Sequence, residues 1–229
     1  MKLGIMQPYF MPYIGYWQLM AAVDTYVIYD DVNYIKKGWI NRNNILVNND
    51  KQLFTISLNG ASQNKLINEI TIADDFTKLR KTIHMAYHKA PYYNDVMSLL
   101  DKIFSYQSSN LADFIANSIK LVCEYLDIQT KIIMSSDLEK DNSLKGQDKI
   151  LEICKLLNVD TYYNAIGGQE LYDKSVFFKE NIKLCFLKSD IPEYSQYKND
   201  FIPRLSIIDV LMFNNPLQVQ QMLTNYTLV

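Results

Sequence analysis

Two short stretches near the N-terminus hold most of the side chains that could do chemistry. The first, Gln7 to Trp17, contains two prolines, one glycine and five aromatic rings. Prolines stiffen a loop, and a glycine lets the backbone approach a neighbour or ligand closely. Tyrosine rings could stack on a small polar ligand and hydrogen-bond to it, although an aromatic packing loop is the alternative. The expected substrate-binding residues here are Gln7, Tyr9, Tyr13, Gly15 and Tyr16.

The second stretch, residues 30–43, mixes carboxylates, cations and a tryptophan. Asp30 and Asp31 are the candidate catalytic residues, because a carboxylate can act as a base, orient a base, or bind a hydroxyl or ammonium group. A guanidinium can form a fork onto a carboxylate or phosphate. The alternative is a solvated charged loop. The expected substrate-binding residues here are Lys36, Lys37, Trp39, Asn41, Arg42 and Asn43.

Two weaker patterns lie further along the chain. Gly167 and Gly168 would allow close approach of a phosphate, or serve equally as a tight turn from strand to helix. His84 and His88 have the i, i+4 spacing of a metal pair, but the sequence between them lacks the usual glutamate, so we expect no metal site. No phosphate-binding Gly-Lys loop, nucleophile elbow or dinucleotide fingerprint occurs in the sequence.

The elements that must position these residues alternate between strands and helices. Residues 2–6 and 25–29 have the apolar character of buried strands, and the segment 14–23 between them favours a helix. This unit fits a right-handed parallel crossover. Two apolar runs, 45–47 and 53–58, flank a polar turn at 48–51 and predict a hairpin. A further strand could lie at 67–72.

The rest of the chain supports the same fold class. Helices are expected at 76–87, 96–104, 111–126, 147–157, 170–178, 207–213 and 217–223, and strands at 131–134, 161–165 and 183–187. This alternation predicts a Rossmann-like α/β fold, an open and mostly parallel sheet with helices on both faces. We expect a single domain over residues 1–229, with residues 75–127 forming a helical insertion or cap.

Composition indicates which partners and which cellular location to expect. The formal net charge of −2 gives no reason to expect a nucleic-acid partner. No apolar run approaches the roughly 20 residues of a membrane span, and the N-terminus lacks the pattern of a signal peptide. Three widely spaced cysteines in apolar surroundings predict small buried hydrophobic residues. We therefore expect a cytoplasmic protein that does not insert into a membrane.

Five motifs together resemble the WbqC-like family, and the resemblance covers nearly the whole chain. They are Met6 to Tyr16, Asp30 to Asn43, Ala90 to Tyr93, Gly167 to Tyr172 and Leu205 to Asp209. Members of this family occur in bacterial gene clusters for O-antigen, the polysaccharide of lipopolysaccharide, and for other surface polysaccharides. The resemblance implies a role in modifying a nucleotide-linked or lipid-linked sugar.

A more distant likeness concerns the first strand-to-helix edge, which is similar to the entry of HIGH-motif nucleotidylyltransferases. Those enzymes use a His-x-Gly-His signature to contact nucleotide phosphates. The matching residues here are Tyr13-Ile14-Gly15-Tyr16, so tyrosines replace both histidines. Tyrosine cannot carry a positive charge, which argues against adenylyl transfer. It can still hydrogen-bond a phosphate or stack on a base or sugar.

The expected function is therefore that of a transferase in surface-polysaccharide biosynthesis. It would attach an acyl or aminoacyl group to an amino sugar carried on a nucleotide, with Asp30 or Asp31 accepting a proton from the attacking amine. Its expected partners are the nucleotide sugar and an activated donor. The alternatives are nucleotidyl transfer and non-catalytic binding of a sugar nucleotide. The sequence identifies no cofactor and leaves open whether copies of the chain form a homo-oligomer.

Overall fold

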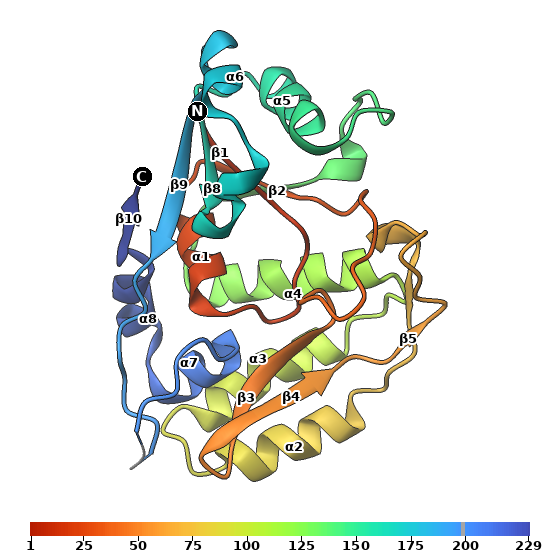
Figure 1. Ribbon diagram of the computed structural model, residues 1–229. Coiled ribbons are helices and arrows are strands. Elements are labelled where there is room, and N and C mark those ends of the chain that lie inside the picture. Colours follow the sequence, from red (N-terminus) through yellow and green to blue (C-terminus); the bar gives the residue numbers. More distant parts are fainter. Residues whose placement is uncertain (198–199) are drawn as a thin grey trace.

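A six-stranded sheet with the order β10–β9–β8–β1–β2–β7 forms the centre of the computed structural model, which describes residues 1–197 and 200–229 (Figure 1). Its strands are β1 (Lys2–Met6), β2 (Thr25–Ile28), β7 (Lys131–Met134), β8 (Thr161–Ala165), β9 (Lys183–Ser189) and β10 (Tyr226–Leu228). All neighbouring pairs are parallel except the β9–β10 pair at the edge. The predicted Rossmann-like α/β fold class is confirmed.

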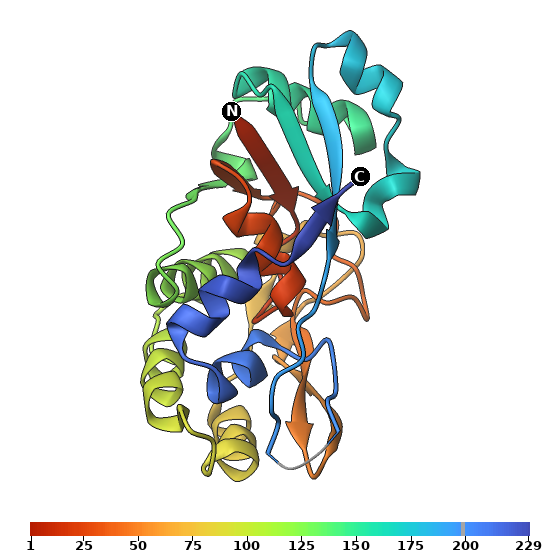
Figure 2. The same ribbon diagram turned by 90° about the vertical axis from the view of Figure 1, so that its left-hand side faces the viewer.

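Alternate side chains of each strand enter two separate cores, as the twofold period of a strand requires. Tyr26 and Ile28 of β2 pack into one core, whereas Val27 between them packs into the other. Figure 2 shows helices on both sides of the sheet. The first core is covered by α1 (Ile14–Ala21), α4 (Leu111–Tyr125) and α8 (Pro216–Leu223), and the second by α5 (Gly146–Leu156) and α6 (Lys174–Lys179).

Helix α1 is buried on every side from Ile14 to Met20, so its one amide side chain needs internal partners. Gln18 is fully buried and donates to the backbone carbonyls of Asp190, Met222 and Asn225 at 2.9–3.0 Å. Its amide oxygen accepts from the Ser189 hydroxyl. Gln18 thus ties the first helix of the chain to the C-terminal segment.

A second group of elements lies beyond the carboxyl ends of the parallel strands, in the lower half of Figure 1. It comprises β3 (Arg42–Val47), β4 (Asp50–Thr55), β5 (Leu58–Asn59), η1 (Ile67–Glu69), β6 (Thr71–Ile72), α2 (Thr77–Tyr87), α3 (Tyr93–Phe104) and α7 (Ile207–Phe213). Within residues 1–197 and 200–229, no helix has the length and apolar character that a membrane span requires.

Three expected elements differ in detail from the structure. The hairpin turn is shorter than predicted, because Asn48 and Asn49 both adopt positive φ and form a two-residue turn. The segment 67–72, expected to be a strand, begins as the short helix η1, and only its end forms strand β6; the first two N–H groups of η1 donate to the carbonyls of Val32 and Asp30. The helix expected at 170–178 is two elements, η3 (Ile166–Leu171) and α6, because Asp173 caps a new helix.

The cysteines and the last helices agree with expectation. Cys123, Cys154 and Cys185 are free and buried. Burial raises the pKa of the Cys123 and Cys154 thiols to about 12, so both stay protonated near neutral pH. Ser206 caps α7 by accepting from the Ile208 N–H at 3.2 Å.

Candidate functional site

The strand order contains a topological switch point between β1 and β8. From β1 the sheet is extended through β2 to β7 on one side, whereas β8 and β9 lie on the other. In open α/β sheets, ligands bind beyond the carboxyl ends of the two strands at such a point. Gln7 follows β1 there, and Gly167 and Gly168 follow β8. Two of the predicted segments therefore meet at one edge.

The aromatic loop after β1 divides into buried and accessible rings. Tyr16 is buried, donates to the Gln7 carbonyl at 3.1 Å and packs 5.5 Å from the Tyr26 ring. Burial is the main cause that raises the pKa of both hydroxyls. Tyr9 and Tyr13 are only partly buried. These two rings, rather than Tyr16, are placed where they could contact a ligand.

Gly15 lies directly beneath the ring of Tyr13. A Cβ atom at position 15 would lie 2.5–2.6 Å from three atoms at the outer end of that side chain, closer than any real contact. The Tyr13 ring therefore covers the first turn of α1. Burial raises the pKa of Tyr13, and the nearby guanidinium of Arg204 acts in the opposite direction. The glycine expected to admit a ligand accommodates a side chain of the protein.

Two asparagines of the second predicted stretch are buried and bonded to the protein itself. Asn41 accepts from the Tyr34 hydroxyl and donates to the Ile56 carbonyl, both at 2.8 Å. Asn43 donates to the Met11 carbonyl at 2.8 Å, and its side-chain oxygen accepts from the next backbone N–H. Their roles in the structure are to hold the aromatic loop and the start of β3 in place.

The cations of this stretch lie at the surface. Arg42 donates from Nε to the Gly38 carbonyl at 2.8 Å and also contacts the Lys37 carbonyl. Its guanidinium carbon lies 5.8 Å from the centre of the Trp39 ring. Lys36, Lys37 and Trp39 are exposed. Arg42 therefore stabilises the loop, whereas the two lysines remain open to solvent.

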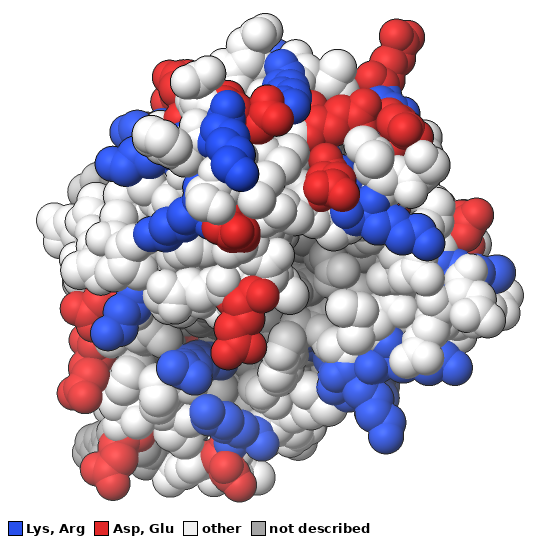
Figure 3. Space-filling model, turned by 45° about the horizontal axis from the view of Figure 1, so that its top comes forward, with Lys and Arg blue, Asp and Glu red and all other residues white. Residues whose placement is uncertain are grey.

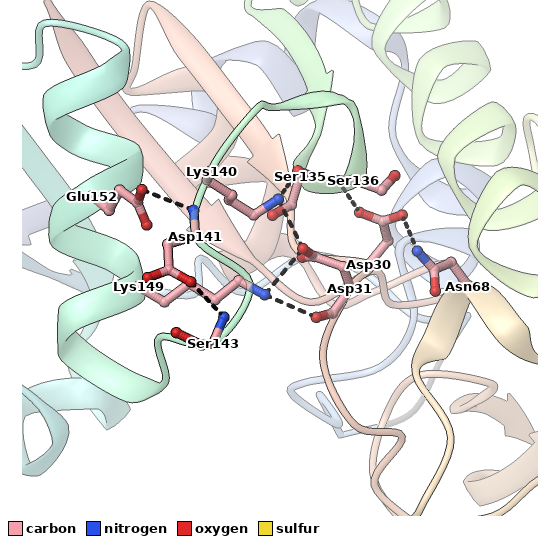
Figure 4. A network of polar contacts seen from close by, with 10 residues as sticks. All are labelled: Asp30, Asp31, Asn68, Ser135, Ser136, Lys140, Asp141, Ser143, Lys149 and Glu152. Carbon is pink, nitrogen blue, oxygen red and sulfur yellow. Dashed lines mark hydrogen bonds and ion pairs between the residues drawn. The ribbon is translucent and has the colours of Figure 1, made fainter.

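Asp30 is a buried hydrogen-bond acceptor between three segments (Figure 4). Its two carboxylate oxygens accept from the Ser136 N–H at 3.0 Å and from the Asn68 side chain at 3.1 Å. Its backbone carbonyl also accepts from the Asn68 N–H at 3.1 Å. Only 1% of the residue is exposed. This geometry favours a positioning role for Asp30 over the role of proton acceptor.

Asp31 points away from Asp30 toward two lysines that the sequence reasoning did not select (Figure 4). Its Oδ2 atom lies 2.8 Å from Lys140 Nζ and 3.0 Å from Lys149 Nζ. Burial raises the pKa of Asp31, but the two lysine ammonium groups outweigh it, so the pKa lies below its usual range. A carboxylate held in its charged form is a weak base.

One signal could have identified Lys149 from the sequence. It precedes Ile150 in the expected amphipathic helix and lies four residues before Ile153, on the apolar face. A charge at such a position needs a buried partner. Lys140 lies in the irregular segment between η2 (Ser135–Asp137) and α5, and its sequence context carries no comparable signal.

At the end of β8 the two glycines have different roles. A Cβ at Gly168 would lie 3.0 Å from the Asn164 side-chain oxygen, so this glycine makes room for Asn164. Asn164 is buried and donates to the Tyr162 hydroxyl at 2.9 Å. At Gly167 nothing lies within 4 Å of the Cβ position. Gly167 is the glycine whose backbone a ligand could approach.

Comparison with known proteins gives a family but no activity. The model of the WbqC-like protein family matches residues 7–221. The chain belongs to the WbqC-like family. It is 27% identical over 218 residues to the uncharacterized protein Rv1507c of Mycobacterium tuberculosis, and the match covers 93% of each chain. No solved structure matches the chain significantly.

Two other features of this WbqC-like protein lie apart from the predicted site residues: the histidine pair of α2 and the surface hollows. His84 and His88 are exposed, and His84 Nδ1 lies 2.7 Å from the Tyr93 hydroxyl. Among the described residues, no three His, Cys, Asp or Glu side chains are grouped as metal ligands. Figure 3 shows basic and acidic side chains interspersed around a central hollow. Hollows of about 710 and 550 Å³ lie beside α2 and near the amino end of β2, and no predicted site residue lines either one.

A buried carboxylate on α7 anchors the segment that carries Arg204. Asp209 accepts from the hydroxyls of Tyr87 and Tyr194 at 2.7 and 2.6 Å and from the Gln196 amide at 2.8 Å. Burial raises the pKa of Asp209, although these three donors act in the opposite direction. The cluster joins α2, α7 and the segment before α7, which brings Arg204 close to Tyr13.

Proposed function

We propose that this WbqC-like protein is a transferase that attaches an acyl or aminoacyl group to the amine of a nucleotide-linked sugar in surface-polysaccharide biosynthesis. The observation that carries the proposal is the switch point between β1 and β8, where the aromatic loop meets the open backbone at Gly167. The family resemblance supports a sugar substrate.

Tyr9 and Tyr13 are the rings proposed to stack on the base or sugar, because both are partly exposed at the carboxyl edge. Gly167 would lie against the sugar nucleotide, and the exposed Lys36 and Lys37 would attract its negative charge from solution. Trp39 lies on the same loop as these lysines and is accessible to a ligand.

The contacts of Asp30 and Asp31 change the proposed chemistry. Asp30 has both oxygens bonded, and Asp31 is paired with two ammonium groups. We therefore assign both to positioning. The sugar amine attacks the activated carbonyl, the C–N bond forms, and the bond to the leaving group breaks. The proton of the amine passes to that leaving group, so the protein acts mainly by holding the two reactants in place.

A thermal-shift panel with product analysis tests the proposal. The ligands are nucleoside diphosphate amino sugars, acyl-coenzyme A and nucleoside triphosphates. A ligand at 100 times its Kd stabilises the fold by about 2.7 kcal/mol, which corresponds to a Tm increase of roughly 5–10 °C for a chain of this size. We expect such shifts with a sugar nucleotide and with an acyl donor, and an N-acylated sugar when both are present.

Tyr9→Ala provides the site variant, and Tyr106→Ala is the matched control, because Tyr106 is an exposed tyrosine that follows the end of α3. The Tyr9 variant should lose most of the shift caused by the sugar nucleotide, and the control should keep it. A shift with nucleoside triphosphates alone, followed by pyrophosphate release, would replace acyl transfer with nucleotidyl transfer. Tight binding of a sugar nucleotide without product from any donor would make the protein a binding protein.

A further inference from the structure

Two buried lysines share a single carboxylate at the ends of β2 and β7. Lys140 and Lys149 lie 2.8 and 3.0 Å from the same oxygen of Asp31. The side chains of the two lysines are 1% and 6% exposed, and that of Asp31 is 9% exposed. Asp31 is the only described carboxylate within 4.0 Å of either ammonium group, and those of Glu152 and Asp141 lie further out in the same network (Figure 4). A buried charge without a counter-charge is strongly unfavourable, so a second anion would stabilise the cluster.

The hydrogen bonds of the cluster leave donors for such an anion. An ammonium group has three donors. Lys140 donates to Asp31 and to the Ser135 carbonyl, and Lys149 donates to the carboxylate and the backbone carbonyl of Asp31. One N–H of each lysine has no acceptor among residues 1–197 and 200–229. The ring of Tyr29 lies 5.3 Å from Lys149 Nζ and adds only the face of an aromatic ring.

The usual phosphate position of a Rossmann-like fold is closed in this protein. Phosphates bind at the N-terminus of the helix that follows β1, where backbone N–H groups are free. Here the Tyr13 ring covers that turn, packed directly over Gly15. Arg42, the cation expected to bind phosphate, bonds to its own loop. The buried cations at the carboxyl edge are those of the lysine cluster.

The lysine cluster lies within reach of a ligand at the switch point. Strand β2 is the direct neighbour of β1, and neighbouring strands are about 4.8 Å apart. Lys140 and Lys149 are held at the end of β2 by Asp31, three residues after that strand ends. Tyr29, whose ring contacts Lys149, is partly exposed at the rim of the cluster. A ligand at β1 and β8 therefore needs to extend by only one or two strand spacings.

We propose that Lys140 and Lys149, held together by Asp31, form a binding subsite for a phosphate-type oxyanion, namely the diphosphate of the nucleotide sugar. The identity of the ligand rests on the proposed function, whereas the oxyanion site rests on the charges and contacts of the cluster alone. Asp31 is a positioning residue in this arrangement, because its carboxylate brings the two ammonium groups to one point. The sugar is then directed toward Tyr9 and Gly167.

Pyrophosphate is the probe that tests the subsite without assuming the sugar. We expect it to bind the wild-type protein by calorimetry, and hydrogen–deuterium exchange to show protection of segments 29–31 and 135–149. Lys149→Gln and Lys140→Gln should each weaken binding by about 10- to 100-fold, the value of one charge-assisted hydrogen bond. Lys155→Gln is the matched control, because Lys155 lies on the same helix but is exposed and pairs with Glu180 at 2.7 Å.

The exchange experiment uses only the wild-type protein, so it decides the question even when a lysine variant does not fold. Pyrophosphate binding without protection of 135–149, or equal affinity of folded Lys149→Gln and wild type, would overturn the subsite. Absence of pyrophosphate binding would do the same. Sugar-nucleotide binding that protects only the segments after β1 and β8 would overturn the subsite and leave the proposed function intact. Protection by pyrophosphate with no binding of any sugar nucleotide would support the oxyanion subsite and overturn the proposed function. Coenzyme A, whose diphosphate offers the same chemistry, identifies the donor as the source when it alone protects the segment.

Discussion

The contact between Tyr13 and Gly15 predicts that Gly15→Ala lowers the free energy of unfolding when Tyr13 is present and raises it when Tyr13 is replaced by alanine. Gly15→Ala introduces a Cβ at 2.5–2.6 Å from the Tyr13 ring, so the ring or the helix must move. Overpacking of this kind costs about 1–3 kcal/mol, whereas alanine in a helix is favoured over glycine by about 0.5–1 kcal/mol. The single variant should therefore lower the free energy of unfolding by about 0.5–2 kcal/mol. In a Tyr13→Ala background the clash is absent, and Gly15→Ala should stabilise by about 0.5–1 kcal/mol.

Urea unfolding of the four proteins of this double-mutant cycle measures both effects, and a thermal melt should show a Tm decrease of about 2–6 °C for the single variant. The four proteins should share one m-value, so that the differences report stability alone. If Gly15→Ala were stabilising in both backgrounds, the Tyr13 ring would not cover the first turn of α1. The N–H groups of that turn would then be open to a phosphate.

Three further predictions concern buried polar groups. Gln18→Leu removes the side-chain donor of the Asp190 carbonyl and one of the donors of the Met222 and Asn225 carbonyls, so it should lower the unfolding free energy by about 1–3 kcal/mol, measured by urea unfolding. Gln220→Leu, which breaks one partly buried bond, should lower it by less than about 1 kcal/mol. The pKa of Asp31 is lowered in the fold, so its stabilising contribution is complete above the ordinary carboxyl pKa and is lost as the pH falls through the lowered value. Asp31→Asn should therefore make the loss of stability below about pH 4 less steep than in the wild type. An unchanged dependence of stability on acid pH would contradict the ion-pair assignment. The pKa of Asp209 is raised, so its charged form reduces stability as the pH rises, and Tyr194→Phe, which removes one of its donors, should destabilise the protein more at pH 8 than at pH 4. Equal destabilisation at both values would show that the carboxyl of Asp209 has the same charge at both.

The β1–α1–β2 unit could be predicted because its information is local. Strand runs bounded by Pro8 and by Asp30, with an apolar helix between them, leave few arrangements for the backbone. The edge strand β10 was not predicted, because its three residues pair with β9 through contacts that no local pattern reveals. Likewise, the short helix at Ile67 depends on carbonyl groups of the segment after β2.

The candidate site was predicted at the level of segments but not of roles. The sequence indicated that Asp31 lies at a strand end, but its partner Lys149 is 118 residues away and appears only when α5 packs on the sheet. Asn43 was expected to bind substrate because it belongs to the polar stretch 30–43. Its real partner is a backbone carbonyl of the other loop. A sequence pattern indicates which side chains are polar, but the hydrogen-bond partners of those side chains depend on tertiary structure.

The carbonyl of Met11 has a consequence for the order in which the chain folds. It accepts hydrogen bonds from Asn43 and from the Ser206 hydroxyl, and Ser206 lies 195 residues further along the chain. The neighbouring Pro12 carbonyl accepts from the Ile207 N–H. Contacts across such sequence separations form late and slow folding. During synthesis, the aromatic loop leaves the ribosome before Ser206 and Ile207, so it gains these two anchors only when the start of α7 emerges. A nascent chain that lacks α7 should therefore form the strands β1 and β2 before the aromatic loop takes the conformation that could bind a ligand.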